Sequence, residues 1–301
     1  MSSPKKVIII LGPTASGKTS MAVRLCREIK GEIISADSRQ LFREMTIGSG
    51  KDLDEYGEIP YHLIDILDAG EEFSVSDFQQ KALEALMDIT NRGVRPVICG
   101  GTGHYVKALI EDYQFDFPKS DLARARHLES LNREALLSRL RSLDQNHPCL
   151  FRKESKRRLA RAIEKLESSS FSSPRLTTYR KNYNHLMLYI ETQRSQISAR
   201  IKARLERRLQ HGLIQEVETL SLLGISDERL ERYGLEYKWV SYFLAGKITR
   251  ERLFEKLYTE IRRYAKRQMT FIRYLEKSGH QPIAIENYDH LSREVKRFLS
   301  H

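Results

Sequence analysis

The chain has 301 residues, of which 40% are hydrophobic and 30% charged, and its formal net charge is +11, as expected for a globular protein with one large domain or two smaller ones. No apolar run approaches the roughly 20 residues of a membrane-spanning helix, and the segment from Met1 to Lys6 leads into a strand pattern without a signal peptide. The cysteines Cys26, Cys99 and Cys149 are far apart, which argues against a zinc site or a disulfide framework and favours a reducing cytoplasm.

In the first 110 residues, short apolar runs alternate with helical patterns. Strands are predicted at residues 7–11, 32–35, 62–67 and 95–99, and helices at residues 18–29 and 75–91. Ser74 or Ser76 is expected to cap the second helix. This alternation predicts an α/β fold, with a parallel sheet that has helices on both faces.

After residue 110, charged helical patterns replace the strand patterns. In chain order they comprise helices at 122–143 and 153–167, a serine-rich breaker at 168–174, a returning core strand in 186–191, helical spacing from 192 to 223 and a last helix at 250–277. The sequence therefore predicts a core of residues 1–112 and 186–301, interrupted by a basic, all-helical insertion at 113–185.

The excess positive charge lies almost entirely in this predicted insertion. Between Lys119 and His185 there are 16 Lys and Arg residues against 7 Asp and Glu, whereas the rest of the chain has 35 against 33. Such a basic block is the electrostatic signature of a polyanionic partner. The alternative interpretation is a solvated helix face.

Residues 12–19, GPTASGKT, match the phosphate-binding loop pattern between a buried strand and an amphipathic helix. Small residues let backbone N–H groups surround phosphate oxygens, and the helix N-terminus adds a favourable dipole. Lys18 is expected to neutralise a terminal phosphate and Thr19 to bind Mg²⁺. Candidates for the second, Mg²⁺-binding Asp of a nucleotide hydrolase are weak, and no GTPase base-recognition motif is present, so the phosphates can belong to another substrate.

Asp37 follows the second predicted strand, in the segment SADSRQ. Because ligands of parallel sheets bind beyond the carboxyl ends of the strands, Asp37 is expected to face the same crevice as the phosphate loop, where a general base belongs. Position alone does not exclude that it caps a following helix.

The chain contains, in order, the blocks GPTASGKT, ISADSRQLF, YHLIDILD, SVSDFQ, PVICGGTGHY, KRRLARAIE, HGLIQEVETL and YAKRQMTFIR. Together they resemble tRNA dimethylallyltransferases (tRNA isopentenyltransferases) over nearly the whole chain. The resemblance implies a P-loop NTPase-like core with an inserted tRNA-binding domain. It also implies that the loop binds the diphosphate of dimethylallyl diphosphate with Mg²⁺, and that the prenyl group is transferred to N6 of the tRNA adenosine immediately 3′ of the anticodon.

The same resemblance assigns roles to individual residues. Asp37 would be the base at N6, and Thr19 and Arg194 would act at the diphosphate. The residues that would hold the diphosphate are Gly12, Pro13, Thr14, Ala15, Ser16, Gly17, Lys18 and Thr19. Those that would contact the tRNA anticodon stem-loop are Asp37, Ser38, Arg39, Gln40, Thr102, Arg124, Lys156, Arg157, Arg158, Leu159 and Ala160.

The chain departs from the family pattern at a few places. His104 follows GGTG where Leu is frequent, Phe271 stands where Trp is frequent, and residues 47–57 differ from the commonest IGTAKP form, so contacts there are open. Glu154 and Ser155 replace a frequent Asn-Asp pair. Without a C-terminal zinc-finger pattern, the chain resembles the bacterial-type members, and a monomer without a membrane or an obligate protein partner suffices.

Three other functions are compatible with a phosphate loop. A nucleotide or small-molecule kinase and an adenylate isopentenyltransferase share the loop and a catalytic Asp, but neither needs the basic insertion. An RNA-binding protein that lacks catalysis would not need Lys18, Thr19 and Asp37 intact.

Overall fold

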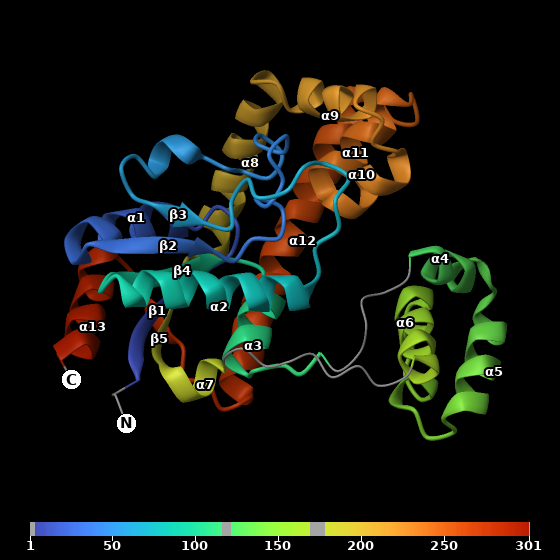
Figure 1. Cartoon of the computed structure of the whole chain (residues 1–301). Coiled ribbons are helices and arrows are strands. Elements are labelled where there is room, and N and C mark those ends of the chain that lie inside the picture. Colours follow the sequence, from blue (N-terminus) through green and yellow to red (C-terminus); the bar gives the residue numbers. More distant parts are fainter. Residues whose placement is uncertain (1–3, 116–121, 169–177, 301) are drawn as a thin grey trace. The chain divides into compact units, whose positions relative to one another are not determined.

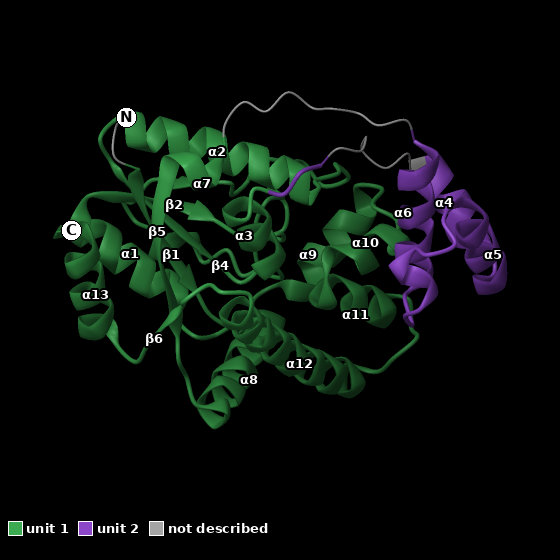
Figure 2. Ribbon diagram, turned by 90° about the horizontal axis from the view of Figure 1, so that it is seen from below, with its two compact units in different colours: residues 1–112, 177–301 green, residues 113–176 purple. Residues whose placement is uncertain are grey.

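The computed structural model describes residues 4–115, 122–168 and 178–300, which belong to two compact units (Figures 1 and 2). Unit 1 comprises residues 1–112 and 177–301, and unit 2 comprises residues 113–176. Among the described residues, no helix is both long and apolar enough to cross a membrane.

Unit 1 is built on a six-stranded sheet with the strand order β3-β2-β4-β1-β5-β6. The strands are β1 (Lys5–Leu11), β2 (Gly31–Ser35), β3 (Tyr61–His62), β4 (Arg95–Gly100), β5 (Tyr183–Ile190) and β6 (Ile283–Ile285). All pairings are parallel, which confirms the predicted fold class.

The helices of unit 1 flank this sheet and extend beyond its carboxyl edge (Figure 1). They are α1 (Lys18–Ile29), η1 (Leu53–Glu55), α2 (Val75–Asn91), α3 (Gly103–Ile110), α7 (Tyr179–Asn182), α8 (Arg194–Gln210), α9 (Leu213–Leu222), α10 (Asp227–Tyr233), α11 (Leu235–Leu244), α12 (Arg250–Lys277) and α13 (Tyr288–Ser300).

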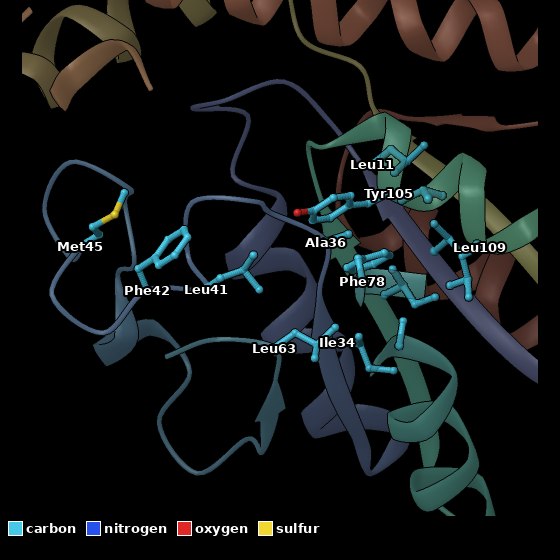
Figure 3. Close-up of a cluster of buried hydrophobic side chains, with 14 of the residues drawn as sticks. Leu11, Ile34, Ala36, Leu41, Phe42, Met45, Leu63, Phe78, Tyr105 and Leu109 are labelled. Atoms are coloured by element: carbon cyan, nitrogen blue, oxygen red, sulfur yellow. The ribbon is translucent and has the colours of Figure 1, made fainter. Parts of the chain in front are cut away.

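Strand β1 is buried on both faces of the sheet. Ile8 and Ile10 belong to a core cluster with residues of α1 and α13. Val7, Ile9 and Leu11 belong to the opposite cluster, which includes residues of α2, α3 and α12. Figure 3 shows part of this cluster, with Leu11 near Tyr105 and Phe78. A strand that is covered on both faces has a continuous apolar sequence. Because β1 is held in the core in this way, the position of the loop that follows it is fixed.

The boundaries of several elements match the sequence patterns. Helices α1, α2 and α12 cover the predicted ranges. Ser74, not Ser76, caps α2: it forms a capping box with Asp77, in which each side chain accepts a hydrogen bond from the other residue's backbone N–H.

The strand predicted at residues 62–67 is wrong, because β3 ends at His62. Leu63 and Asp65 have positive φ angles of 61° and 54°, which are incompatible with a strand. The chain instead turns toward the segment after β2, where Ile66 and Leu67 donate backbone hydrogen bonds to the Leu41 carbonyl at 2.9 and 3.0 Å.

Two long predicted helices are each interrupted. The helix predicted from 122 to 143 is two helices, because Asn132 caps the second one by accepting from the Ala135 N–H. The helical pattern from 192 to 223 likewise divides into α8 and α9 at Gly212.

Unit 2 is helical in its described part. It consists of α4 (Leu122–Ser130), α5 (Arg133–Leu143), η2 (Pro148–Leu150) and α6 (Lys156–Glu167). Its core is formed mainly by Leu128, Leu136, Leu140, Leu159 and Ile163.

The insertion ends before residue 185, the end predicted from the sequence. Residues 178–185 belong to unit 1, because they contain α7 and the start of β5. Tyr179 and Tyr183 are buried in the core of unit 1, with ring centroids 5.4 Å apart. The serine-rich breaker falls mostly outside the described residues.

Candidate active site

One pocket lies at the carboxyl ends of β1, β2 and β4, the three adjacent strands at the centre of the sheet. Its lining residues are Thr14, Lys18, Asp37, Arg39, Ser49, Arg208, Leu235, Glu236, Ile261, Tyr264 and Gln268. The fold therefore brings Asp37 to the phosphate loop, as its position after β2 predicts. No helix directly follows Asp37, whose Oδ1 accepts from the Arg39 N–H at 3.1 Å in a local turn.

The phosphate loop connects β1 to the N-terminus of α1. Ala15 and Gly17 have φ angles of +63° and +87°, which turn successive peptide groups around the loop. The first turn of α1 has no acidic residue, and no side chain caps it. Ser16 Oγ is buried and has no partner among the described atoms. A helix N-terminus without a side-chain cap or an acidic residue, together with the unpaired Ser16 hydroxyl, fits an anionic group with several oxygens.

Gln268 of α12 connects the phosphate loop to the turn after β4. Its Oε1 accepts from the Thr14 N–H at 2.7 Å, and its Nε2 donates to the Gly101 carbonyl at 3.0 Å. A Cβ at position 101 would lie 2.0 Å from Nε2, so only glycine allows this approach. One buried amide thus holds the ends of β1 and β4 in a fixed relation.

Three arginines on one face of α8 approach the pocket. Arg200 donates to the Ser16 carbonyl at 3.4 Å, and Arg204 donates to Thr14 Oγ1. Arg208 donates to the Gly48 carbonyl at 3.5 Å. A spacing of four residues places all three on the same side of a helix.

This group of arginines carries more positive charge than its protein partners neutralise. Burial, and next the charge of Arg208, lower the pKa of Arg204 to about 10. Nη2 of Arg208 is buried without a partner among the described atoms. An anionic ligand would relieve this repulsion.

Arg194, predicted at the diphosphate, is the exposed first residue of α8. The contacts that the structure records between α8 and the phosphate loop come from Arg200 and Arg204. These two residues were not predicted from the sequence, although arginines spaced four residues apart along the helix are a usable signal.

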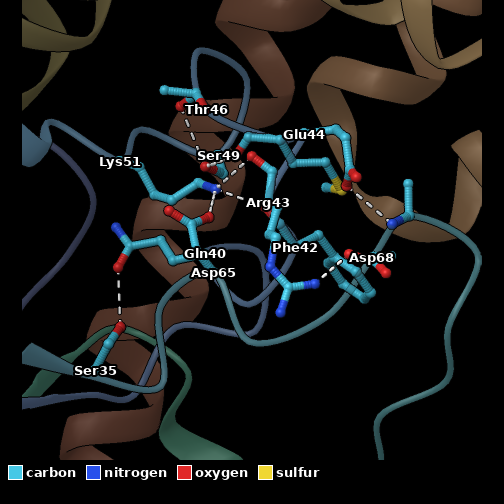
Figure 4. A network of polar contacts seen from close by, with 12 residues as sticks. Ser35, Gln40, Phe42, Arg43, Glu44, Thr46, Ser49, Lys51, Asp65 and Asp68 are labelled. Atoms are coloured by element: carbon cyan, nitrogen blue, oxygen red, sulfur yellow. Dashed lines mark hydrogen bonds and ion pairs between the residues drawn. The ribbon is translucent and has the colours of Figure 1, made fainter.

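The segment from Asp37 to Gln40 is held by contacts with four other parts of unit 1. The Ser38 N–H donates to Thr102 Oγ1 at 3.1 Å, and Arg39 pairs with Glu236 at 2.6 Å. Gln40 accepts from Ser35 Oγ at 2.9 Å (Figure 4) and donates to the Gly50 carbonyl at 3.3 Å. The side chains of Arg39 and Gln40 are thus engaged within the protein, and their contact with RNA stays a prediction.

The loop after this segment forms one wall of the pocket, through Ser49. The buried Lys51 donates to the Phe42 carbonyl at 2.5 Å and pairs with Asp65 (Figure 4). The Glu216 carboxylate of α9 accepts from three successive backbone N–H groups, those of residues 46–48, at 2.6–2.9 Å. The first part of the 47–57 loop, whose role the sequence left open, is therefore fixed by a lysine and a carboxylate.

In unit 2, the predicted RNA contacts divide into two kinds. The side chains of Lys156, Arg157 and Arg158, named here the α6 cations, are exposed at the start of α6. Leu159 and Ala160 are buried in the core of unit 2, and their contact with RNA stays a prediction. Helix periodicity turns these two residues inward.

Arg124, the other contact predicted in unit 2, pairs with Glu167 of α6 and is 46% exposed. The Glu167 side chain is only 13% exposed and also pairs with Arg139 at 2.6 Å, so contact of Arg124 with RNA stays a prediction.

No group of three or more His, Cys, Asp or Glu residues suited to a metal ion occurs in the described parts of the chain. Thr19, in the first turn of α1, is the expected protein ligand.

Comparisons with known proteins agree on one family. The IPP transferase model matches residues 40–274, and the isopentenyl transferase model matches residues 5–58. A tRNA dimethylallyltransferase 2 of Syntrophotalea carbinolica is 44% identical over 279 residues, which cover 91% of this chain and 92% of the relative. A tRNA dimethylallyltransferase 1 of Syntrophus aciditrophicus is 40% identical over 301 residues, which cover 97% of this chain and 98% of the relative.

Solved structures share the fold. The crystal structure of the tRNA isopentenylpyrophosphate transferase from Bacillus halodurans has a TM-score of 0.71 and 32% identity, covering 98% of this chain and 96% of that one. The structure of a eukaryotic dimethylallyltransferase acting on tRNA has a TM-score of 0.76 and 24% identity, covering 94% of this chain and 74% of that one. At this identity the likeness supports the fold alone.

Proposed function

The chain belongs to the IPP transferase family of tRNA dimethylallyltransferases, and on this premise we propose that it transfers the dimethylallyl group of dimethylallyl diphosphate to N6 of the tRNA adenosine immediately 3′ of the anticodon. The observation that carries the proposal is the shared pocket of Lys18 and Asp37. It places a cation for a diphosphate and a carboxylate for a proton at one site.

The loop end of this pocket suits the donor. The diphosphate would occupy the turn formed by Gly12 to Thr19, with Lys18, Arg200 and Arg204 around its charge. The Thr19 hydroxyl would hold Mg²⁺, which when bound supplies further neutralisation of the leaving group. Fixed positive groups at the position where negative charge develops stabilise the transition state.

The Asp37 end suits the acceptor. An exocyclic amine is a poor nucleophile because its lone pair is delocalised into the purine ring. In the reaction, N6 forms a bond to C1 of the prenyl group, the C1–O bond breaks, and its electron pair leaves with diphosphate. The N6 proton passes to the Asp37 carboxylate, as a general base requires. Because a stacked base cannot be reached in place, the adenosine must be extruded from the anticodon loop.

We assign to unit 2 the binding of the anticodon stem. The α6 cations and Arg124 would contact phosphates, which gives affinity without sequence reading. This assignment explains why the basic block lies in the insertion and not in unit 1. It also disfavours a kinase or an enzyme that acts on free adenylate.

The test is a transfer assay with radiolabelled dimethylallyl diphosphate, Mg²⁺ and unmodified tRNA that has adenosine 3′ of the anticodon. Label is expected in RNA, and after digestion on that single nucleoside. Parallel reactions replace the tRNA by AMP, or replace the donor by labelled ATP. Label that appears only on AMP, or ATP-dependent phosphorylation without prenyl transfer, would refute the proposal.

A further inference from the structure

We propose that Glu236 is a positioning residue, which holds the Arg39 guanidinium away from Asp37 so that the Asp37 carboxylate stays free to accept a proton. The inference rests on the proposed function, because it concerns the same base. It also changes the role of Arg39 from an RNA contact to part of the support of the base.

The pair between Arg39 and Glu236 is almost fully buried. Nη1 of Arg39 lies 2.6 Å from Oε2 of Glu236, and the two side chains are 14% and 4% exposed. The other carboxylate oxygen of Glu236 lies 3.8 Å from Nη1 of Arg208. Glu236 lies in the first turn of α11, where a negative charge is favoured by the helix dipole. It is therefore the counter-ion that α11 supplies to this side of the pocket.

Arg39 is enclosed on its other sides as well. Its Cζ lies 4.8 Å from the centre of the Tyr264 ring of α12, in a cation–π contact. The backbone at Gly234 approaches so closely that a Cβ there would lie 3.0 Å from Nε of Arg39. The guanidinium therefore has one defined position in the structure, set by α11 and α12.

This position matters because Arg39 follows Asp37 by two residues and lines the same pocket. Burial by itself would lower the pKa of Arg39, but Glu236 and, to a smaller extent, Tyr264 and Asp37 raise it above its ordinary value. Asp37 is thus one of the anionic groups around the Arg39 charge. Without Glu236, Asp37 would be left as a competing partner, and a carboxylate paired with arginine is a weaker base.

The experiment compares Glu236→Gln, Arg39→Met and the double variant in the transfer assay, with kcat and the KM for tRNA measured separately. Glu236→Gln is expected to lower kcat about 20-fold, with the KM for tRNA changed less than about twofold. Arg39→Met is expected to lower kcat only about threefold, because no cation then remains to pair with Asp37. The double variant is expected to match Arg39→Met and so to recover most of the loss.

The matched control is Glu231→Gln, at a carboxylate that pairs with Lys238 at 2.9 Å with both side chains about one-third exposed. It should leave kcat and KM unchanged. If Glu236→Gln does not fold, Arg39→Met and the double variant are compared directly, and equal turnover is expected.

The proposal is overturned if the double variant is as slow as Glu236→Gln, if it is much slower than Arg39→Met, or if Arg39→Met and Glu236→Gln both act through the KM for tRNA. A wild-type protein that prenylates tRNA while Glu236→Gln has normal turnover refutes this inference alone. A wild-type protein that does not prenylate tRNA refutes the proposed function instead.

Discussion

Replacing Arg204 by methionine is expected to make the ligand-free protein more stable and its binding of diphosphate weaker. Burial and the neighbouring Arg208 lower the pKa of Arg204 from its ordinary value to about 10. The folded state therefore binds this proton less tightly than the unfolded state does. The resulting penalty is fully present at neutral pH and is relieved only as the pH rises above about 10 toward the ordinary pKa of arginine.

The size of the effect follows from this shift. This difference in pKa between the folded and unfolded states corresponds to about 3 kcal/mol of unfolding free energy. We reduce it to about 2 kcal/mol because the side chain reaches the edge of the pocket. Methionine also loses the hydrogen bond to Thr14 Oγ1, which is worth about 1 kcal/mol. The net expectation is a gain of about 1 kcal/mol in the free energy of unfolding, or an increase of about 2 °C in Tm.

The assay is thermal unfolding with and without inorganic pyrophosphate and Mg²⁺. Pyrophosphate at about 100 times its Kd should stabilise the wild-type protein by about 2.7 kcal/mol, and most of this gain should disappear in Arg204→Met. Arg207→Met, at an exposed position of the same helix, is the control and should behave like the wild type. A lower Tm for the free Arg204→Met protein than for the control, or a retained response to pyrophosphate, would refute the reasoning.

Three further predictions concern the base, the insertion and the acid limit of stability. Asp37→Asn should bind tRNA with unchanged Kd but lose about 10³-fold in kcat, and near-normal turnover would exclude it as the base. Replacing all three α6 cations by alanine should weaken tRNA binding and reduce the slope of log Kd against log salt by about two, as filter binding can measure. Burial and then His280 lower the pKa of His185 from 6.5 to about 4, so acidification through this range should cost up to about 3 kcal/mol of unfolding free energy. Denaturant titrations of His185→Gln should lack this loss.

The residues at the strand ends were predictable from the sequence. The apolar run of β1 and the glycines after it define the phosphate loop by local pattern alone, and Asp37 follows the next strand. In a parallel sheet all carboxyl ends face one edge, so topology needs no further detail to bring Lys18 and Asp37 together. The basic insertion was visible for a similar reason, since charge excess is a property of composition.

The predicted boundaries of helices and strands were wrong where tertiary contacts overrule the local conformational preference. The apolar pattern at residues 62–67 is that of a strand, yet Asp65 is drawn toward the buried Lys51 and the chain turns. The helical pattern at 122–143 continues through Asn132, whose side chain instead caps a new helix. Periodicity reports which residues are apolar, not which partner each backbone group finds.

The sequence by itself determined the kind of chemistry: a polyphosphate loop, a carboxylate beside it and a polyanion partner. The tertiary structure decided which side chains support them. Gln268 lies 254 residues from Thr14, Arg204 lies 190 residues from it, and Glu236 lies 197 residues from Arg39. No local pattern encodes such contacts, because they depend on how α8, α11 and α12 pack over the edge of the sheet. The same burial lowers the pKa of Arg204 and leaves Arg39 dependent on a single carboxylate.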